Sequence, residues 1–173
     1  GAASLWISED FEAWSILDGL VRQALARTYG QYELHYLVPQ SGSPVFESEL
    51  FWKRFEELVN CYKADPFILH KLSWAFADCD DRVRVKVLTL ILASDPKGDA
   101  LDAVYLRKSS MIGSQTEGFI PSKQREILAL EEIIAALPSD PAFLKHKVWI
   151  KRKIMDIKKD IESEQWSLFL EGR

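Results

Sequence analysis

The side chains that bind metals or act as nucleophiles are few in this chain, and they lie far apart in the sequence. The histidines are His35, His70 and His146, and the two cysteines, Cys61 and Cys79, are separated by 18 positions. Zinc sites use Cys or His residues in pairs a few positions apart. We therefore expect no metal site. Because His70 lies in an apolar stretch, we expect it to be a hydrogen-bonded core residue.

Three carboxylates at Asp78, Asp80 and Asp81 are close enough in sequence to act as a general acid and base. They lie, however, between the expected end of one helix and the start of the next, where Asp is a common capping residue. The sequence contains none of the motifs GxGxxG, GxxxxGK[ST], GxSxG or HExxH, which mark common cofactor sites and hydrolases. These observations favour a non-catalytic function with no catalytic residue and no cofactor.

The composition is that of one folded domain with a large core. The chain has 173 residues, of which 47% are apolar and 28% charged, and a domain of this size buries close to 70% of its surface. We interpret residues 1–4 as a cloning remnant, and a targeting segment that preceded them would then have been removed. We expect a single domain over residues 5–173. No apolar run is long enough to span a membrane.

The two cysteines are expected to be free and buried, since a domain with this core does not need a disulfide. Free thiols are typical of reducing compartments. The sequence therefore predicts an intracellular protein of the cytosol, the nucleus or an organelle interior.

Apolar residues at helical spacing, capping side chains and prolines together predict an all-α fold. The architecture we expect is an irregular helical bundle of about seven helices with a long C-terminal helix. The first helix is predicted to start at Ser8 and stop at Gly30, with Phe11 and Tyr29 on its apolar face. The further helices are expected at residues 44–63, 67–78, 81–93, 99–108, 122–137 and 140–170, with a mobile connection at 109–121.

Two segments have patterns that also fit a strand. Residues 32–38 fit either a helical turn or a short strand, and the sequence leaves both open. In residues 81–93, Val83, Val85 and Val87 alternate with charged residues as in a strand. Asp80 is nevertheless well placed as a helix cap, and the apolar residues between 83 and 92 also fall on one helical face. We therefore predict a helix for residues 81–93.

The last predicted helix, residues 140–170, carries most of the positive charge of the protein. Its length is about 45 Å at 1.5 Å per residue. Residues 143–160 hold seven Lys or Arg against two Asp, a net charge of +5, so that the total of −4 leaves −9 on the remainder. Such a contrast makes this helix the most favourable place for an acidic partner to bind.

The apolar residues of this helix fall into two stripes about 120° apart at 100° per residue. The stripes consist of Ile150, Ile154, Ile157 and Ile161, and of Leu144, Val148 and Met155. One stripe can pack on the domain and the other on a partner. Alternatively, both fill one wide groove of the domain while the lysines extend into water.

We therefore predict a non-catalytic protein-interaction module, such as a regulatory, adaptor or assembly-factor domain. Its partner is expected to be another protein with an acidic surface, and a second copy of the chain is the alternative partner. The expected contact residues are Lys145, Trp149, Lys151, Arg152, Lys153, Lys158 and Lys159.

Two other functions stay open at this point. One is a small enzyme or ligand-binding domain with a pocket among the core aromatic residues. The other is a nucleic-acid-binding domain that uses the basic C-terminal helix. The negative charge of the remainder disfavours nucleic acid, because it repels phosphate.

Overall fold

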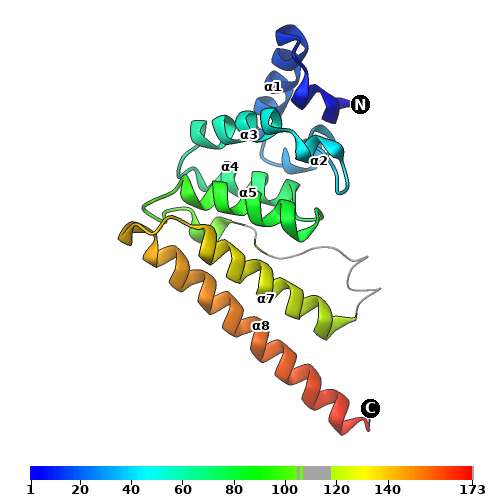
Figure 1. The fold of residues 1–173 in the computed structure, drawn as a ribbon, viewed down its shortest axis with the longest axis vertical. Coiled ribbons are helices and arrows are strands. Elements are labelled where there is room, and N and C mark those ends of the chain that lie inside the picture. The colour runs from blue at the N-terminus through cyan, green and yellow to red at the C-terminus, as the bar shows by residue number, and fades with distance from the viewer. Residues whose placement is uncertain (105, 107–117, 173) are drawn as a thin grey trace.

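The computed structural model describes residues 1–104, 106 and 118–172, and within them the chain forms seven α-helices, four short 3-10 helices and no strand. The predicted all-α fold with a long C-terminal helix is confirmed. The helices are stacked in three layers (Figure 1). The first layer contains α1 (Phe11–Ala26), α2 (Gln31–Leu37) and α3 (Glu49–Cys61). The second, middle layer contains α4 (Pro66–Ala75) and α5 (Asp81–Ala93). The third contains α7 (Phe119–Ala136) and α8 (Leu144–Leu170).

The start of the first layer differs from the prediction. Ser8 is not the N-cap of α1 but follows the last residue of a 3-10 helix, and its Oγ accepts a hydrogen bond from the Asp10 amide at 3.1 Å. Asp10 caps α1 instead and accepts from the Glu12 amide at 3.0 Å. The preceding 3-10 helix η1 (Ala2–Ile7) places Trp6 in the core, where its Nε1 donates to the Leu37 carbonyl oxygen at 2.8 Å.

α1 ends at Ala26 and not at Gly30, where the sequence placed its end. The buried side chain of Lys71, on α4, explains the earlier end. Its ammonium group donates to the carbonyl oxygen of Leu25 at 2.7 Å and to that of Arg27. Carbonyl groups in the last turn of a helix have no helical partner, so this ammonium group satisfies them.

The segment at 32–38, which fitted either a helix or a strand, forms helix α2. Phe11 and Tyr29, both predicted to face the core, are 75% and 74% exposed. Phe11 is the first residue of α1, ahead of its buried face, and Tyr29 lies in the connection to α2. Tyr32 and Tyr36 on α2 are exposed as well.

The helix predicted at 44–63 is two helices, η2 (Pro44–Glu47) and α3, separated by an extended residue at Ser48 (φ −87°, ψ 126°). This break lets Phe46 of η2 fold back on Phe51 of α3, with ring centroids 5.3 Å apart. Phe55 and Phe76 join the same cluster, at 5.3 Å from each other. These aromatic rings form the centre of the core.

The middle layer largely follows the sequence. Asp65 caps α4 through the amides of the next residues, as predicted, although α4 ends at Ala75 and not at residue 78. α5 is a helix over residues 81–93, as predicted, and Asp80 accepts from the Val83 amide at 3.0 Å. All the apolar residues of its predicted inner face are buried: Val83, Val87, Leu88, Ile91 and Leu92.

In the connection between the second and third layers, residues 99–104 and 106 are the described part of the helix expected at 99–108. Of these, only Leu101–Ala103 are helical, in the 3-10 helix η3. Residues 105, 107 and 108, and residues 109–117 of the connection expected to be mobile, lie outside the described residues. α7 starts at Phe119 with Gly118 (φ 82°) before it, so Ser122 is not its cap. Pro121 fits there because a first-turn amide needs no helical partner.

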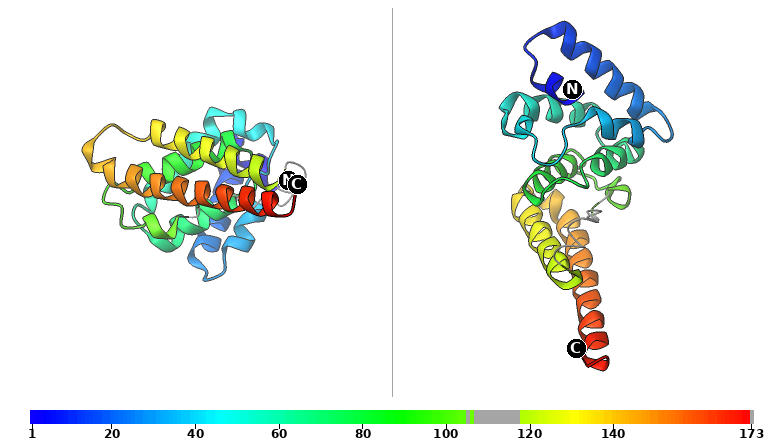
Figure 2. Two further views of the ribbon diagram at one scale, coloured as in Figure 1. Left: turned by 90° about the horizontal axis from the view of Figure 1, so that it is seen from below. Right: turned by 90° about the vertical axis from the view of Figure 1, so that its right-hand side faces the viewer.

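α7 and α8 run antiparallel as a hairpin (Figure 2). α8 is preceded by η4 (Pro141–Phe143), which Asp140 caps at 2.9 Å through the Ala142 amide. α8 is longer than α7, and its C-terminal end extends beyond the start of α7 (Figures 1 and 2). α8 packs mainly on α7 and η4, so its opposite side is open.

Candidate functional site

The two apolar stripes predicted on α8 have different environments. Ile150, Ile154 and Ile161 of the first stripe are buried in contact with the rest of the domain. The residues of the second stripe are exposed: Leu144 at 62%, Val148 at 43% and Met155 at 59%. The alternative in which both stripes fill one groove of the domain is therefore wrong. One stripe holds α8 in place and the other faces outward.

The C-terminal end of α8 continues this outward apolar side. Trp166 lies 18 residues after Val148, which is five full turns of a helix, so both point to the same side. Trp166 and Phe169 are 63% and 70% exposed, and their rings stack at 5.5 Å with an interplanar angle of 25°. Leu170 is 67% exposed beside them.

The predicted contact residues are mostly exposed, and helical spacing divides them into two groups. Lys151 and Lys158 lie on one side of the second stripe. On its other side lie Lys145, Arg152 and Lys159. None of these cations forms an ion pair with another described residue. We call the second stripe with Trp166 and these five cations the outer face of α8.

The other two predicted contact residues, Trp149 and Lys153, are turned away from the outer face. The Trp149 indole Nε1 donates to Asp102 Oδ1 at 3.1 Å, and the Lys153 ammonium lies 5.1 Å from the centre of the indole ring. Asp102 belongs to η3, 47 residues earlier in the chain. The sequence contains no signal for this contact, because the segment around Asp102 was expected to be an ordinary helix.

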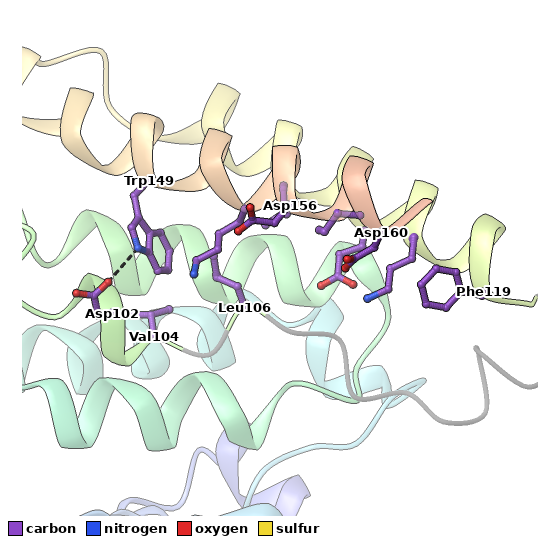
Figure 3. A pocket seen from close by; sticks show the side chains of 12 residues that line it. Asp102, Val104, Leu106, Phe119, Trp149, Asp156 and Asp160 are labelled. Atoms are coloured by element: carbon purple, nitrogen blue, oxygen red, sulfur yellow. Dashed lines mark hydrogen bonds between the residues drawn. The ribbon is translucent and has the colours of Figure 1, made fainter. Parts of the chain in front are cut away.

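Trp149 lines two hollows on the surface of the protein. The first, the Asp156 hollow, has a volume of about 690 Å³ and is shown in Figure 3. Its apolar lining includes Val104, Leu106 and Phe119. The charged side chains that line it are Asp102, Glu126, Asp156, Asp160, Lys123 and Lys153. The lining therefore contains apolar, acidic and basic side chains.

The second hollow, the Val148 hollow, has a volume of about 710 Å³ and opens beside the first turns of α8. Leu144 and Val148 of the second stripe line it, together with the buried Leu101 from η3. Lys145 and Arg152 supply cations to the same hollow. The structure thus brings together in one hollow residues that the sequence analysis assigned separately to an apolar stripe and to a basic surface.

A buried charge network lies below the Asp156 hollow. The Arg84 guanidinium, 4% exposed, donates to the Leu106 carbonyl oxygen at 2.9 Å and approaches Glu126 at 3.9 Å. Asp81 lies 3.5 Å from Arg84 and 3.1 Å from Arg125. The network ties α5 to α7 and holds residue 106 in place. The contact with Arg84 gives the buried Glu126 carboxylate a structural role. Removal of one partner from a buried ion pair is strongly destabilising.

The remaining candidates for chemistry occupy separate, structural positions. The fully buried His146 lies with Nε2 2.6 Å from the Asp95 carbonyl oxygen, and His70 Nδ1 is 2.6 Å from the Ala103 carbonyl oxygen. His70 is thus hydrogen-bonded, as expected. Asp80 caps α5, as predicted. Within the described ranges, no group of three or more His, Cys, Asp or Glu side chains is placed to hold a metal ion.

The cysteines are both free, but only Cys79 is buried. The prediction that Cys61 is buried is wrong, because Cys61 is the last residue of α3 and lies beyond its buried face. Burial, together with the negative charges of Asp80 and Asp78, raises the pKa of the Cys79 thiol to about 12. Cys79 is therefore a protonated thiol at neutral pH, and thiolates are the reactive form.

These environments predict a difference in thiol reactivity. In the native protein at about pH 8, near the pKa of an ordinary thiol, a charged disulfide reagent should titrate one thiol quickly. After unfolding without reductant the count should be two. In the Cys61→Ser variant the fast native thiol should be absent. A count of zero in the unfolded wild type would instead reveal a disulfide, and two fast native thiols would show that Cys79 is accessible.

Comparisons of the chain with protein-family models, with curated proteins and with solved structures found no match. Among the helices of the described residues, none is long and apolar enough to cross a membrane.

Proposed function

We propose that this protein is a non-catalytic protein-interaction module, an adaptor, regulatory or assembly-factor domain, that presents the outer face of α8 to an acidic surface of a partner protein. The observation that carries the proposal is the exposed apolar stripe between cations that form no ion pair with another described residue. Leu144 and Met155 are 62% and 59% exposed on a helix whose other side is well packed. Isolated exposed apolar residues are ordinary, but an aligned set bordered by charge is typical of interaction sites.

The charges and the apolar residues would have different roles in binding. Residues 143–160 carry a net charge of +5, whereas the rest of the chain carries −9. The cations of α8 would therefore steer an acidic partner to this helix and raise the association rate at low salt. Apolar contact would then supply most of the affinity, because burial of apolar surface is the dominant favourable contribution in most protein–protein association. The expected signature is an association rate that falls with salt while the dissociation rate changes little.

A second copy of the chain is a less favourable partner for this face. Two copies that met through their outer faces would place the same cations opposite one another, and like charges repel. A second copy could offer its acidic body instead. Such a head-to-tail contact produces open chains unless the rotation closes into a ring. The charge distribution therefore favours a different protein with an acidic surface.

Ligand binding, with or without catalysis, and nucleic-acid binding remain alternatives, and each rests on a different surface of the protein. The Asp156 hollow, at about 690 Å³, supports ligand binding, although its aromatic lining is Trp149 and Phe119 and not the core cluster around Phe51. A thermal shift on addition of organic amines, lost in Asp156→Asn, would favour this function. Nucleic acid would use the outer face, and its affinity would fall steeply with salt.

Charge reversal on the outer face tests the proposal. In the variant Lys151→Glu, Arg152→Glu, Lys158→Glu, the free energy of unfolding should change by less than about 1 kcal/mol, because exposed charges contribute little to stability. Partner capture should be abolished at low salt. Partners captured from the native source are identified by mass spectrometry, and the purified partner is then titrated against wild type and variant at low and high salt.

The control carries the same charge change on another surface. Lys53, Lys63 and Arg82 are exposed and lie on the first two layers, so their reversal to Glu should leave partner capture intact. Equal binding by wild type and the outer-face variant would refute the proposal. An unfolded outer-face variant would mean that these cations hold the domain together. Labelled DNA and RNA probes in the same titration test the nucleic-acid alternative.

A further inference from the structure

We propose that the Val148 hollow is an anchor pocket for one apolar side chain of the partner, in a segment that also carries a carboxylate for Arg152. This inference rests on the proposed function of the outer face and adds to it the chemistry of the bound segment. The hollow, of about 710 Å³, lies where the second stripe of α8 meets η3 and η4. It is large enough for a leucine, methionine or phenylalanine side chain and a part of the backbone that carries it.

The lining of the hollow is apolar apart from three charged residues, Asp102, Lys145 and Arg152. Leu101, 4% exposed, comes from η3. Leu144 and Val148 come from α8 and are 62% and 43% exposed, so a large part of their apolar surface is open to water. Pro141 of η4 also lines the hollow. An apolar side chain placed here would remove these surfaces from water, which is the main source of affinity in anchor pockets.

Two solvent-exposed hydrogen bonds involve residues that line the hollow. The Trp149 indole donates to Asp102 at 3.1 Å. The Lys145 ammonium donates to the Lys97 carbonyl oxygen at 3.3 Å, and its stem passes beside Gly98. A Cβ on Gly98 would lie 3.2 Å from Lys145 Cδ, and Gly98 has φ +72°. A glycine is therefore needed where the lysine stem crosses.

The charges around the hollow select the sign of the partner. Among the residues that line the hollow, Arg152 and Lys145 are positive, and Asp102 is negative and already bonded to Trp149. The local balance is therefore positive. Arg152 forms no ion pair with a described residue, and its planar guanidinium binds carboxylates through two parallel hydrogen bonds.

The spacing on α8 sets the arrangement of the bound segment. Arg152 follows Val148 by four residues, which is about one turn, or 6 Å along the helix. A carboxylate bound to Arg152 must therefore belong to a residue close to the apolar anchor in the partner. The segment that fits is a short acidic peptide with an apolar residue and an Asp or Glu within about one turn of it.

The test uses the full chain and a phage-displayed library of random peptides as the probe. Peptides that survive selection should contain Leu, Met or Phe next to Asp or Glu. The most enriched peptide is then synthesised with a fluorescent label, and its Kd is measured by anisotropy. For the variant Leu144→Ser, Val148→Ser the Kd should rise about tenfold or more. Ala142→Trp, which fills the hollow from an exposed position of η4, should have the same effect.

The matched control is Leu128→Ser, at a residue of α7 that is 59% exposed and lies outside both the hollow and the outer face. It should change the Kd by less than about threefold, since the peptide is not expected to contact it. Circular dichroism and denaturation midpoints must match wild type for each variant. Arg152→Gln should raise the Kd and reduce its dependence on salt, an effect that a purely structural role for Arg152 would not produce.

The outcomes separate this inference from the proposed function. If the charge reversal of Lys151, Arg152 and Lys158 weakens the peptide but the Leu144 and Val148 variant does not, the anchor pocket is refuted and the interaction face stands. If Leu128→Ser is as harmful as the hollow variants, the loss of binding is not specific to the hollow and the pocket is again refuted. If neither charge reversal nor hollow variants matter, both proposals fail. A selection without enrichment also overturns the anchor pocket.

Discussion

Replacement of Phe76 by alanine is expected to lower the free energy of unfolding by about 3–5 kcal/mol, the range for buried aromatic residues. Phe76 is 1% exposed, and its ring lies 5.3 Å from that of Phe55 and 6.3 Å from that of Phe46. These rings come from η2, from α3 and from the residue that follows α4, so a cavity here loosens the contact between the first and second layers. Chemical denaturation measures the loss.

The control for this variant is Phe67→Ala, the same change on α4 at a residue that is 78% exposed. Its free energy of unfolding should stay within about 0.5 kcal/mol of wild type, as for most surface substitutions. A loss of less than about 1 kcal/mol for Phe76→Ala would mean that the aromatic cluster rearranges to fill the space.

A second large effect is expected at Gly30, where α2 begins against the end of α1. A Cβ at Gly30 would lie 1.5 Å from the Ala24 carbonyl oxygen, far inside atomic contact. Because the obstacle is backbone, the two helices would have to separate. Gly30→Ala should therefore lower the free energy of unfolding by about 3 kcal/mol or more, at the upper end for overpacked sites.

Gly19→Ala is the matched control, since it makes the same chemical change inside α1. No atom lies within 4 Å of a Cβ at Gly19, and alanine is the better helix former, so stability should rise by about 0.5–1 kcal/mol. The two variants should thus shift the denaturation midpoint in opposite directions. A Gly30→Ala protein as stable as wild type would contradict the close approach of α1 and α2.

Local signals in the sequence identified most of the helices. At α5, Asp80 and the apolar residues of one face were sufficient, because a cap and an amphipathic face are properties of neighbouring residues. Local signals failed where distant residues decide the outcome. α1 ends early because Lys71, from α4, binds its last carbonyl groups. At the break at Ser48, Phe46 packs on Phe51 of the next helix, a contact that the local pattern does not show.

The same distinction applies to the candidate site. The sequence predicted the basic, doubly striped helix and its contact residues, and the structure separates the stripes into a buried one and an exposed one. It could not predict which stripe is buried, because that depends on the position of α7. It also placed Trp149 and Lys153 with the outer cations, whereas the bond between Trp149 and Asp102 turns this pair toward η3.

The three layers are arranged in space in the order in which they occur along the chain (Figure 1). Each layer packs chiefly on the one before it: α4 and α5 on the first layer, and the hairpin of α7 and α8 on α5. As a ribosome releases the chain from its N-terminus, each new layer would therefore find its packing surface already formed. Predominantly local topology also favours fast folding. A nascent chain arrested after α5 should already contain a protease-resistant N-terminal core, whereas α8 would gain its packing only after release of the whole hairpin.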